Sequence, residues 1–322
     1  MGGKLKEIAI EIIQRCPNCC IHCSSFSDLH KTYVMPLEKV WEIVNDAKDL
    51  GALRVCISGG EPFLHPDIVE IVKYISGKGL ECYLYSSGIY YEDGAYGSIP
   101  SVLLNLIQPY LTKLIVNYET TDPVKYNTIM GTDCNGLKLL DESVKKAVAL
   151  GMIVEAHFVP MHINFMDAEA VIDRCKDLGM KRVSFLRLVM QGRALEHFSD
   201  TSISEQEIDY FISRVNSKSG DCLFRLGTPF QKNSFHCACT AGAQKISVRY
   251  DGNVYPCESF KNDEPKGLVS HRPDNIYKKS FKEIYLHSPY LDEVRSLVKA
   301  FKAKKLCESC INQYYRVHNF EH

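Results

Sequence analysis

Three cysteines near the start of the chain have a spacing suited to iron–sulfur chemistry. Cys16, Cys20 and Cys23 form a C-x3-C-x2-C run. Three thiolates can hold a four-iron cluster and leave one of its irons without a protein ligand, whereas structural zinc and cluster sites take four protein ligands. A free iron site can bind a small molecule. The run therefore predicts a reactive metal centre rather than a structural one.

Zinc is the alternative for this run, because Cys16 with Cys19 and Cys20 with Cys23 each make a C-x2-C pair. Such pairs supply half of a four-thiolate zinc site. Cys19 lies outside the three-ligand spacing, and we expect it to be a bystander. The turn that follows the next predicted strand argues against zinc.

That turn is rich in glycine and comes directly after the second predicted strand, Leu53–Ile57. It reads Ser58-Gly59-Gly60-Glu61-Pro62. Glycines allow the backbone to approach a ligand closely, and Glu61 offers a negative partner for an ammonium group. Alone, such a turn would be ordinary loop chemistry. Its position, one strand–helix unit after the cysteine run, makes it a candidate ligand site.

Together the two motifs resemble the signatures of the radical S-adenosylmethionine (radical SAM) superfamily. The resemblance implies a [4Fe-4S] cluster on Cys16, Cys20 and Cys23, whose open iron is chelated by the amino and carboxylate groups of S-adenosylmethionine (SAM). It also implies that the aromatic face of His22 packs against the adenine. The residues that it assigns to the loop around the SAM ammonium are Gly59, Gly60, Glu61 and Pro62.

Other polar residues at strand ends are weaker candidates for contacts with SAM. Ser86 and Ser87 follow the third predicted strand and Asn117 ends the fourth, where hydroxyl and amide groups could meet the ribose hydroxyls. Arg187 and Arg193 lie at or beyond the sixth, where an arginine could pair with the SAM carboxylate. For each of these residues, a structural role in a turn or at the barrel rim is an equally good interpretation.

A second set of cysteines lies near the C-terminus. Cys239 is followed by twelve residues, Gly252, four residues and Cys257, and a later C-x2-C pair consists of Cys307 and Cys310. The layout resembles the auxiliary-cluster extension of radical SAM enzymes, in its short "twitch" rather than its longer SPASM form. It implies an auxiliary [4Fe-4S] cluster with four thiolate ligands that moves electrons. A structural zinc ribbon is the alternative, since four thiolates suit zinc equally well.

Three details of this region stay open. Cys237 competes with Cys239 as the first ligand, although the spacing to Gly252 favours Cys239. No cysteine follows Cys310, so we do not expect a second auxiliary cluster. Cys222 is a candidate hydrogen-atom donor to a substrate radical, and an ordinary buried cysteine is the alternative.

The elements that must position these residues alternate between short strands and longer helices up to about residue 195. The expected strands are Glu7–Ile13, Leu53–Ile57, Glu81–Tyr85, Lys113–Asn117, Ile153–Phe158 and Arg182–Leu188. Expected helices include Pro36–Leu50, Asp141–Leu150 and Ala168–Leu178, each followed by a glycine cap, and Ser204–Ser217. Six strand–helix units predict an α/β fold, a partial (β/α)6 TIM-type barrel, with its chemistry at the carboxyl ends of the strands.

The strand–helix rhythm stops near residue 221, which predicts two domains. We expect residues 1–220 to form the barrel and residues 221–322 to form a small cysteine-rich α+β domain. That domain should contain a hairpin made of Lys245–Tyr250 and Val254–Cys257, because the intervening Asp251-Gly252-Asn253 is a strong turn signal.

Composition excludes several classes of protein. The 322 residues include 38 basic and 39 acidic side chains, so no single-sign field exists to attract nucleic acid or an anionic membrane. Fourteen cysteines in tight clusters fit metal ligation better than a secreted disulfide framework. The N-terminal residues lack an apolar signal segment, and no apolar run has membrane-spanning length. We therefore expect a cytoplasmic protein.

The resemblance implies an enzyme that cleaves SAM reductively to a 5′-deoxyadenosyl radical and abstracts a hydrogen atom from its substrate. A peptide is the expected substrate, as in the maturation of ribosomally made peptides, and the electron donor is expected to be a flavodoxin or ferredoxin. An added N-terminal leader-binding domain is not expected, since the cluster motif begins by residue 16. The alternatives are a dehydrogenase or epimerase of a small aminocyclitol-like or sugar-like alcohol, and a non-catalytic zinc or iron–sulfur module.

Overall fold

The structure is a computed structural model of the chain, and it describes residues 4–218, 224–227, 230, 239–262 and 269–303. Several features predicted from the sequence lie outside the described residues. They are Cys222, Cys237, Cys307, Cys310 and the domain boundary after residue 220.

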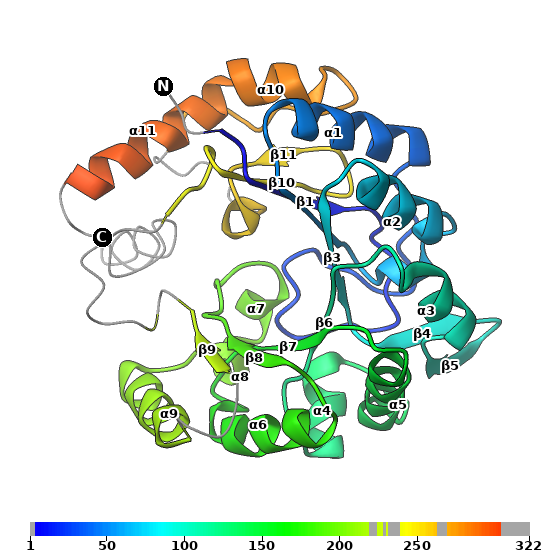
Figure 1. Cartoon of the computed structure of the whole chain (residues 1–322). Coiled ribbons are helices and arrows are strands. Elements are labelled where there is room, and N and C mark those ends of the chain that lie inside the picture. The colour runs from blue at the N-terminus through cyan, green and yellow to red at the C-terminus, as the bar shows by residue number, and fades with distance from the viewer. Residues whose placement is uncertain (1–3, 219–223, 228–229, 231–238, 263–268, 304–322) are drawn as a thin grey trace.

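A nine-stranded sheet forms the centre of the fold, in the order β11-β10-β1-β2-β3-β6-β7-β8-β9. The six predicted strands are its middle: β1 (Glu7–Glu11), β2 (Arg54–Ser58), β3 (Glu81–Ser86), β6 (Lys113–Asn117), β7 (Val154–Phe158) and β8 (Arg182–Phe185). All pairings among these six are parallel. Figure 1 shows the sheet curving into an open barrel with helices outside it, so the predicted partial barrel is confirmed.

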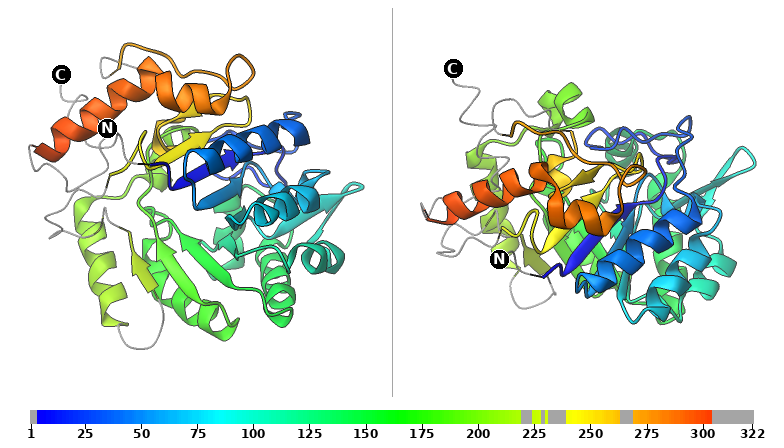
Figure 2. Two further views of the ribbon diagram at one scale, coloured as in Figure 1. Left: turned by 45° about the horizontal axis from the view of Figure 1, so that its top comes forward. Right: turned by 90° about the horizontal axis from the view of Figure 1, so that it is seen from above.

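Helices cover the outer face of the curved sheet (Figure 2). The helices of the described residues are α1 (Leu37–Asp49), α2 (Ile68–Gly77), α3 (Ser101–Ile107), α4 (Pro123–Met130), α5 (Gly136–Ala149), α6 (Ala168–Asp177), α7 (Arg193–Glu196), α8 (Phe198–Thr201), α9 (Glu205–Ser217), α10 (Phe281–His287) and α11 (Pro289–Ala303). Among the described residues, single turns of 3-10 helix lie at Pro62–Leu64, Phe165–Asp167 and Glu258–Phe260. The predicted helices are present, although α5 begins at Gly136 rather than at Asp141. Ser204 caps α9 with a reciprocal hydrogen-bond pair to Glu207.

The C-terminal part of the chain extends the barrel sheet at both edges. The predicted hairpin is present as β10 (Lys245–Val248) and β11 (Val254–Tyr255), and β10 pairs in parallel with β1. A strand that the sequence did not predict, β9 (Phe224–Leu226), pairs in parallel with β8. The sheet therefore takes strands from both of the predicted domains.

A second unpredicted feature is the hairpin of β4 (Ile89–Glu92) and β5 (Ala95–Ser98). Its turn is Asp93-Gly94, where both residues have positive φ angles of 48° and 82°. Asp-Gly is a favoured pair for this kind of turn, so the signal was available in the sequence. The Arg15 guanidinium lies 5.9 Å from the centre of the Tyr91 ring, which places the hairpin beside the cysteine run.

Polar and apolar residues alternate along the strands in a way that shapes the inside of the barrel. In β1, Ile8 and Ile10 are fully buried in the apolar core, whereas Glu7, Ala9 and Glu11 line an internal cavity. Since side chains of a strand point alternately to its two faces, the helix-facing side is apolar and the inner side is polar. The barrel thus has its hydrophobic core between sheet and helices and keeps its interior for ligands.

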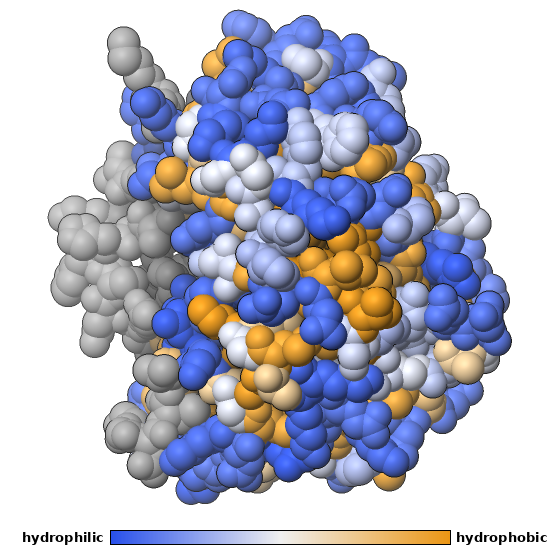
Figure 3. Space-filling view, turned by 45° about the vertical axis from the view of Figure 1, so that its right-hand side comes forward, coloured by the Kyte–Doolittle hydropathy of each residue, from blue (hydrophilic) through white to orange (hydrophobic). Residues whose placement is uncertain are grey.

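The outer surface is largely hydrophilic on the face shown in Figure 3, with an apolar area near its middle. Within the described residues, none of the helices combines the length and the apolar character needed to cross a membrane.

A buried ion pair joins the segment after β11 to the first strand. The Lys261 ammonium contacts the Glu11 carboxylate and lies 3.1 Å from the Ser25 hydroxyl, which itself donates to Glu11 at 2.6 Å. The Lys261 and Glu11 side chains are only 8% and 4% exposed. Burial alone would lower the pKa of Lys261, but the charge and hydrogen bond of Glu11, together with the charge of Glu258, raise that pKa above its usual value.

We expect Lys261→Met to lower the free energy of unfolding by about 3 kcal/mol, because it leaves the Glu11 carboxylate buried without its cation. The double variant Glu11→Gln/Lys261→Met should recover part of this loss. Lys282→Met is a matched control that removes an exposed pair with Asp49, worth less than about 1 kcal/mol. Anaerobic urea denaturation measures all three, and equal effects of Lys261→Met and Lys282→Met would contradict the assignment.

Candidate active site

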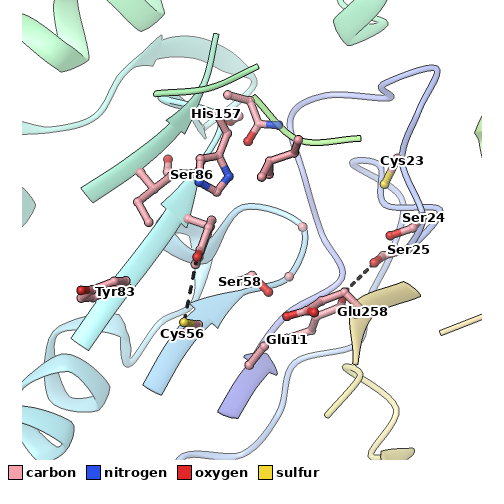
Figure 4. Close-up of a pocket in the computed structure, with 18 of the residues that line it drawn as sticks. Glu11, Cys23, Ser24, Ser25, Cys56, Ser58, Tyr83, Ser86, His157 and Glu258 are labelled. Carbon is pink, nitrogen blue, oxygen red and sulfur yellow. Dashed lines mark hydrogen bonds between the residues drawn. The ribbon is translucent and has the colours of Figure 1, made fainter. Parts of the chain in front are cut away.

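A cavity of about 750 Å³ occupies the inside of the barrel and reaches the loops at the carboxyl ends of its strands. The predicted site residues that line it are Cys16, Cys20, His22, Cys23, Gly59, Gly60, Ser86, Ser87 and Asn117. The side chains of Glu61, Pro62, Arg187 and Arg193 lie elsewhere. Figure 4 shows Cys23, Ser24 and Ser25 at one side of the cavity and His157 and Ser86 at the other.

The three cysteines of the run share this cavity, whereas Cys19 is exposed and does not line it. Burial raises the pKa of the Cys16 and Cys20 thiols, and neighbouring thiols of the run add to the rise. Bound iron would supply the positive charge that keeps such thiolates deprotonated. In the described ranges, no three His, Cys, Asp or Glu side chains converge as the ligands of one metal ion would.

Gly59 and Gly60 bring two backbone segments into direct contact. A Cβ atom on Gly59 would fall under 3.0 Å from the Ile13 carbonyl oxygen, and one on Gly60 would meet the Arg15 carbonyl equally closely. The N–H of Gly60 donates to Ile13 O at 2.6 Å, and that of Glu61 donates to Arg15 O at 2.8 Å. The glycines therefore allow close packing against Ile13 and Arg15, which directly precede the cysteine run. This role is additional to the one predicted from the sequence, which is to let the backbone approach a ligand.

Two further glycines, which sequence reasoning missed, support the rest of the run. A Cβ atom on Gly131, after α4, would fall under 3.0 Å from the Cys19 carbonyl oxygen. One on Gly192, after β8, would lie 2.5 Å from the Cys23 carbonyl oxygen. These contacts join segments far apart in the sequence, so no local pattern marks them. We call Gly60, Gly131 and Gly192 the glycine cradle.

The Glu61 carboxylate is fully buried and serves the protein itself. It accepts hydrogen bonds from the Ser87 N–H (2.7 Å), the Ser87 hydroxyl (2.6 Å), the Ser86 hydroxyl (2.8 Å) and the Phe63 N–H (3.2 Å). Burial raises the pKa of Glu61, and these hydrogen bonds oppose the rise. Glu61 thus ties the loop after β2 to the loop after β3, while the Gly59–Gly60 backbone faces the cavity. Its predicted contact with the SAM ammonium stays a prediction.

The two arginines predicted near the SAM carboxylate have different surroundings. Arg193 is 7% exposed and donates to the backbone carbonyls of Cys20 (2.9 Å) and Ser27 (2.7 Å). Arg187 is paired with the exposed carboxylate of Glu205 at 2.9 Å. In this structure Arg193 is a positioning residue for the cysteine run, and Arg187 lies outside the cavity. A carboxylate contact by either one stays a prediction.

His22 lies in an environment that keeps its ring neutral. Its Nε2 atom is 3.6 Å from the Glu119 carboxylate, and burial lowers the pKa of His22 to about 4, with the Arg193 charge adding to the effect. Burial also raises the pKa of Glu119 to about 8. Glu119, which the sequence analysis did not single out, accepts from the Val159 N–H at 2.8 Å and from the Asn117 amide at 3.4 Å. A neutral aromatic ring on this wall suits the predicted stacking with adenine.

The wall beside the cysteine run carries polar atoms that lack partners. Asn18 is 1% exposed, and neither its Nδ2 nor its Oδ1 atom has a hydrogen-bond partner among the described residues. The same holds for His22 Nδ1. Burying an unpaired amide costs roughly 2–7 kcal/mol, depending on the reference state. A cluster with its sulfur acceptors, together with the polar groups of SAM, would satisfy these atoms, so the residues present fit the predicted group.

Two of the four predicted auxiliary-cluster ligands are described. Cys239 and Cys257 are both half-buried and pack against the main core. The Cys257 sulfur lies 2.9 Å from the Ser259 hydroxyl. The other two, Cys307 and Cys310, lie outside the described residues, so the complete set stays a prediction.

We expect Gly131→Ala to prevent stable cluster binding, because its methyl group would collide with the Cys19 carbonyl. Gly151→Ala is the matched control, since Gly151 has a similar left-handed backbone (φ +75°, against +58° at Gly131) but nothing within 4 Å of its Cβ position. Both variants carry a backbone cost of about 1 kcal/mol. Iron content and visible absorbance after anaerobic reconstitution compare them, and equal iron in the two variants would contradict the glycine cradle.

Arg193→Met should also reduce iron content, because it leaves the Cys20 and Ser27 carbonyls without their charged donor. Arg187→Met removes an arginine that pairs only at the surface and should leave iron content unchanged. Calorimetric titration with SAM then gives a second readout, with affinity expected to fall at least tenfold only in Arg193→Met. A loss of iron confined to Arg187→Met would reverse the assignment.

Comparison with known proteins gives relatives over most of the chain. It is 24% identical over 270 residues to "Probable GTP 3',8-cyclase" of Methanococcus maripaludis, covering 80% of this chain and 86% of that protein. It is 25% identical over 307 residues to "PqqA peptide cyclase" of Methylobacterium nodulans, covering 93% and 77%.

Solved structures show the same fold at low sequence identity. SuiB of Streptococcus suis bound to precursor peptide SuiA has a TM-score of 0.74 at 16% identity, covering 96% of this chain and 73% of that one. anSMEcpe with bound AdoMet and Cp18Cys peptide has a TM-score of 0.64 at 15% identity, covering 94% and 87%.

Two family models account for the two cysteine sets. The model of the radical SAM superfamily matches residues 10–202, and that of the SPASM iron–sulfur cluster-binding domain matches residues 237–311. The first range contains the cysteine run and the Gly59–Pro62 loop, and the second contains Cys239, Cys257, Cys307 and Cys310. The cofactors of this chain are accordingly a [4Fe-4S] cluster, SAM and an auxiliary iron–sulfur centre. The chain belongs to the radical SAM superfamily and carries a C-terminal SPASM-type extension.

Proposed function

We propose that this radical SAM enzyme modifies a peptide by removing a hydrogen atom from one of its carbons. The observation that carries the proposal is the internal cavity of about 750 Å³, which has the three cluster thiols on its wall and continues down the barrel. One relative is named a peptide cyclase, and SuiB, whose fold is similar, was solved with a precursor peptide. When bound, the reduced cluster and SAM supply a 5′-deoxyadenosyl radical.

The residues of this chain would orient SAM and keep water away. The neutral His22 ring offers a stacking face, and the Gly59–Gly60 backbone offers a close, uncharged surface. Glu61 holds Ser86 and Ser87 in place through its hydrogen bonds. Fixing the target carbon near the reactive carbon of the cofactor is the main task left to the protein.

We assign the auxiliary cluster to Cys239, Cys257, Cys307 and Cys310, with Cys237 as the alternative first ligand. Four thiolates leave no iron open for substrate, so this cluster would carry electrons.

Cys222 is proposed as a hydrogen-atom donor after abstraction, and a flavodoxin or ferredoxin as the source of electrons. We place the boundary between the barrel and extension domains after residue 220, and the enzyme in the cytoplasm.

A small polar molecule is the second candidate substrate. The observation that favours it is the similarity to proteins named as probable GTP cyclases, which covers 80% of this chain. For such a small substrate, the reaction would be the oxidation or epimerisation of an aminocyclitol-like or sugar-like alcohol.

Cleavage of SAM tests the activity without knowledge of the substrate. The anaerobically reconstituted protein should release 5′-deoxyadenosine with a strong reductant, and Cys16→Ala should release none, because the cluster loses one of its three ligands. Cys19→Ala is the matched control and should keep the activity, since Cys19 is exposed and outside the cavity. No 5′-deoxyadenosine from the wild-type protein would exclude both substrate classes and favour a non-catalytic module.

Iron analysis should give about eight irons for two four-iron clusters, and about four would exclude the auxiliary one.

The peptide assignment is tested by the genes beside this one. Co-expression with a small precursor peptide encoded there should change the peptide's mass, and Cys16→Ala should leave it unmodified. A neighbourhood of sugar or cyclitol enzymes with no small peptide gene would favour the second candidate. Cys222→Ala distinguishes outcomes further, since full activity in that variant would rule out its role as hydrogen donor.

A further inference from the structure

Below the cofactor end, the interior of the barrel is highly charged. Six cationic and four carboxylate side chains line the cavity: Arg54, Lys113, Arg182, Arg225, Lys245, Lys261, Glu7, Glu11, Glu155 and Glu258. They project from the inner faces of the strands or from the segment after β11. A buried charge needs a partner, either from the protein or from a ligand. Arg225 is exposed on the edge strand β9, whereas the other nine side chains are at least partly buried.

Most of these charges neutralise one another. The pairs are Arg54–Glu7 (3.1 Å), Lys245–Glu7 (3.2 Å), Lys245–Glu258 (3.2 Å), Lys113–Glu155 (2.6 Å) and Lys261–Glu11. Arg54 has a further partner in Glu81 at 2.6 Å. All four carboxylates of the cavity wall are thus engaged with a cation.

Two arginines are left over on one wall. Across the part of the chain that the structure describes, neither Arg182 of β8 nor Arg225 of β9 has an ion-pair or side-chain hydrogen-bond partner. Arg225 lies opposite Ser184 in the strand pairing, two residues along β8 from Arg182. Arg182 lies opposite Glu155, whose carboxylate is already bound by Lys113. Positive charge therefore accumulates where β7, β8 and β9 meet.

The neighbouring His157 adds no charge of its own to this wall. Burial lowers its pKa to about 3, and the charges of Arg225 and Lys245 contribute to the fall. Its ring centre lies 5.4 Å from that of Tyr85, so two aromatic rings border the arginines in the cavity lining. Figure 4 shows His157 pointing into the cavity. Neutral His157 can still donate a hydrogen bond to an anion.

From this arrangement we infer that Arg182 and Arg225 bind a carboxylate of the substrate inside the barrel. The guanidinium group presents a planar fork of N–H donors that matches the two oxygens of a carboxylate. The inference rests on the proposed peptide substrate and narrows it to one with an acidic group that reaches down the barrel from the cofactor end. In a peptide, that group is either an Asp or Glu side chain or the C-terminal carboxylate.

Three short peptides separate these sources without any turnover. Acetyl-Gly-Glu-Gly-amide carries only a side-chain carboxylate, acetyl-Gly-Gln-Gly with a free C-terminus carries only the terminal one, and acetyl-Gly-Gln-Gly-amide carries none. Isothermal titration calorimetry is done anaerobically on the reconstituted, SAM-loaded full-length protein. At least one acidic peptide should bind about tenfold more tightly than the neutral one, and the preferred one identifies the source.

The preference should disappear in Arg182→Gln and in Arg225→Gln. It should persist in Arg272→Gln, which removes an exposed arginine away from the cavity. Iron content and circular dichroism establish that each variant is folded. Equal binding of all three peptides, no binding of any, or an acidic preference that survives both substitutions would overturn the inference. Failure of the proposed function itself would appear separately, as absent 5′-deoxyadenosine or an unmodified precursor peptide.

Discussion

The close contact between the glycine cradle and the cysteine run is the constraint on which the site depends. The run has no regular secondary structure between Cys16 and Cys23. Within it the Cys23 N–H donates to the Cys20 carbonyl, whereas the N–H groups of Cys16, Cys19 and Ile21 donate to the carbonyls of Asp28, Met130 and Ile129 in other segments. Other segments fix the shape of the run: Gly60, Gly131 and Gly192, in three separate connections of the barrel, pack against its backbone, and the Arg193 side chain donates hydrogen bonds to it. Because backbone–backbone contact without a Cβ leaves little freedom, small changes in the barrel are transmitted directly to the thiols.

The cavity joins two environments with opposite electrostatics. Near the cysteine run, burial lowers the pKa of His22 and keeps its ring uncharged, which suits a cofactor that brings its own charges. Further down the barrel, ion pairs and the Arg182 and Arg225 side chains form a charged lining that suits a polar substrate. One fold thus divides cofactor binding from substrate binding along the axis of its strands, since alternation along each strand fixes which residues face inward.

Local patterns were enough to predict much of this architecture. The six central strands, four of the helices (α1, α5, α6 and α9), the Lys245–Cys257 hairpin and the two cysteine sets follow from hydrophobic alternation, caps, turn signals and spacing. The rest depends on contacts between distant segments, which leave no local trace. The sequence around Gly131 and Gly192 does not show that these glycines contact Cys19 and Cys23 in the folded chain. Likewise, Glu119 and Asn18 gain meaning only from what surrounds them, and β9 is too short to carry a pattern.

The parallel pairing of β1 with β10 has a consequence for how the protein is made. On one side β1 pairs with β2, which follows it closely in the chain, but its other edge stays open until Lys245–Val248 has been synthesised. The same late segment brings Lys261 to Glu11 and Asn262 to the carbonyl of Ser24. An N-terminal half emerging from the ribosome would therefore expose an unpaired strand edge next to an incompletely supported cysteine run. Truncated translation products would therefore be prone to aggregate, and we expect the cysteine run to reach its final shape only in a nearly finished chain.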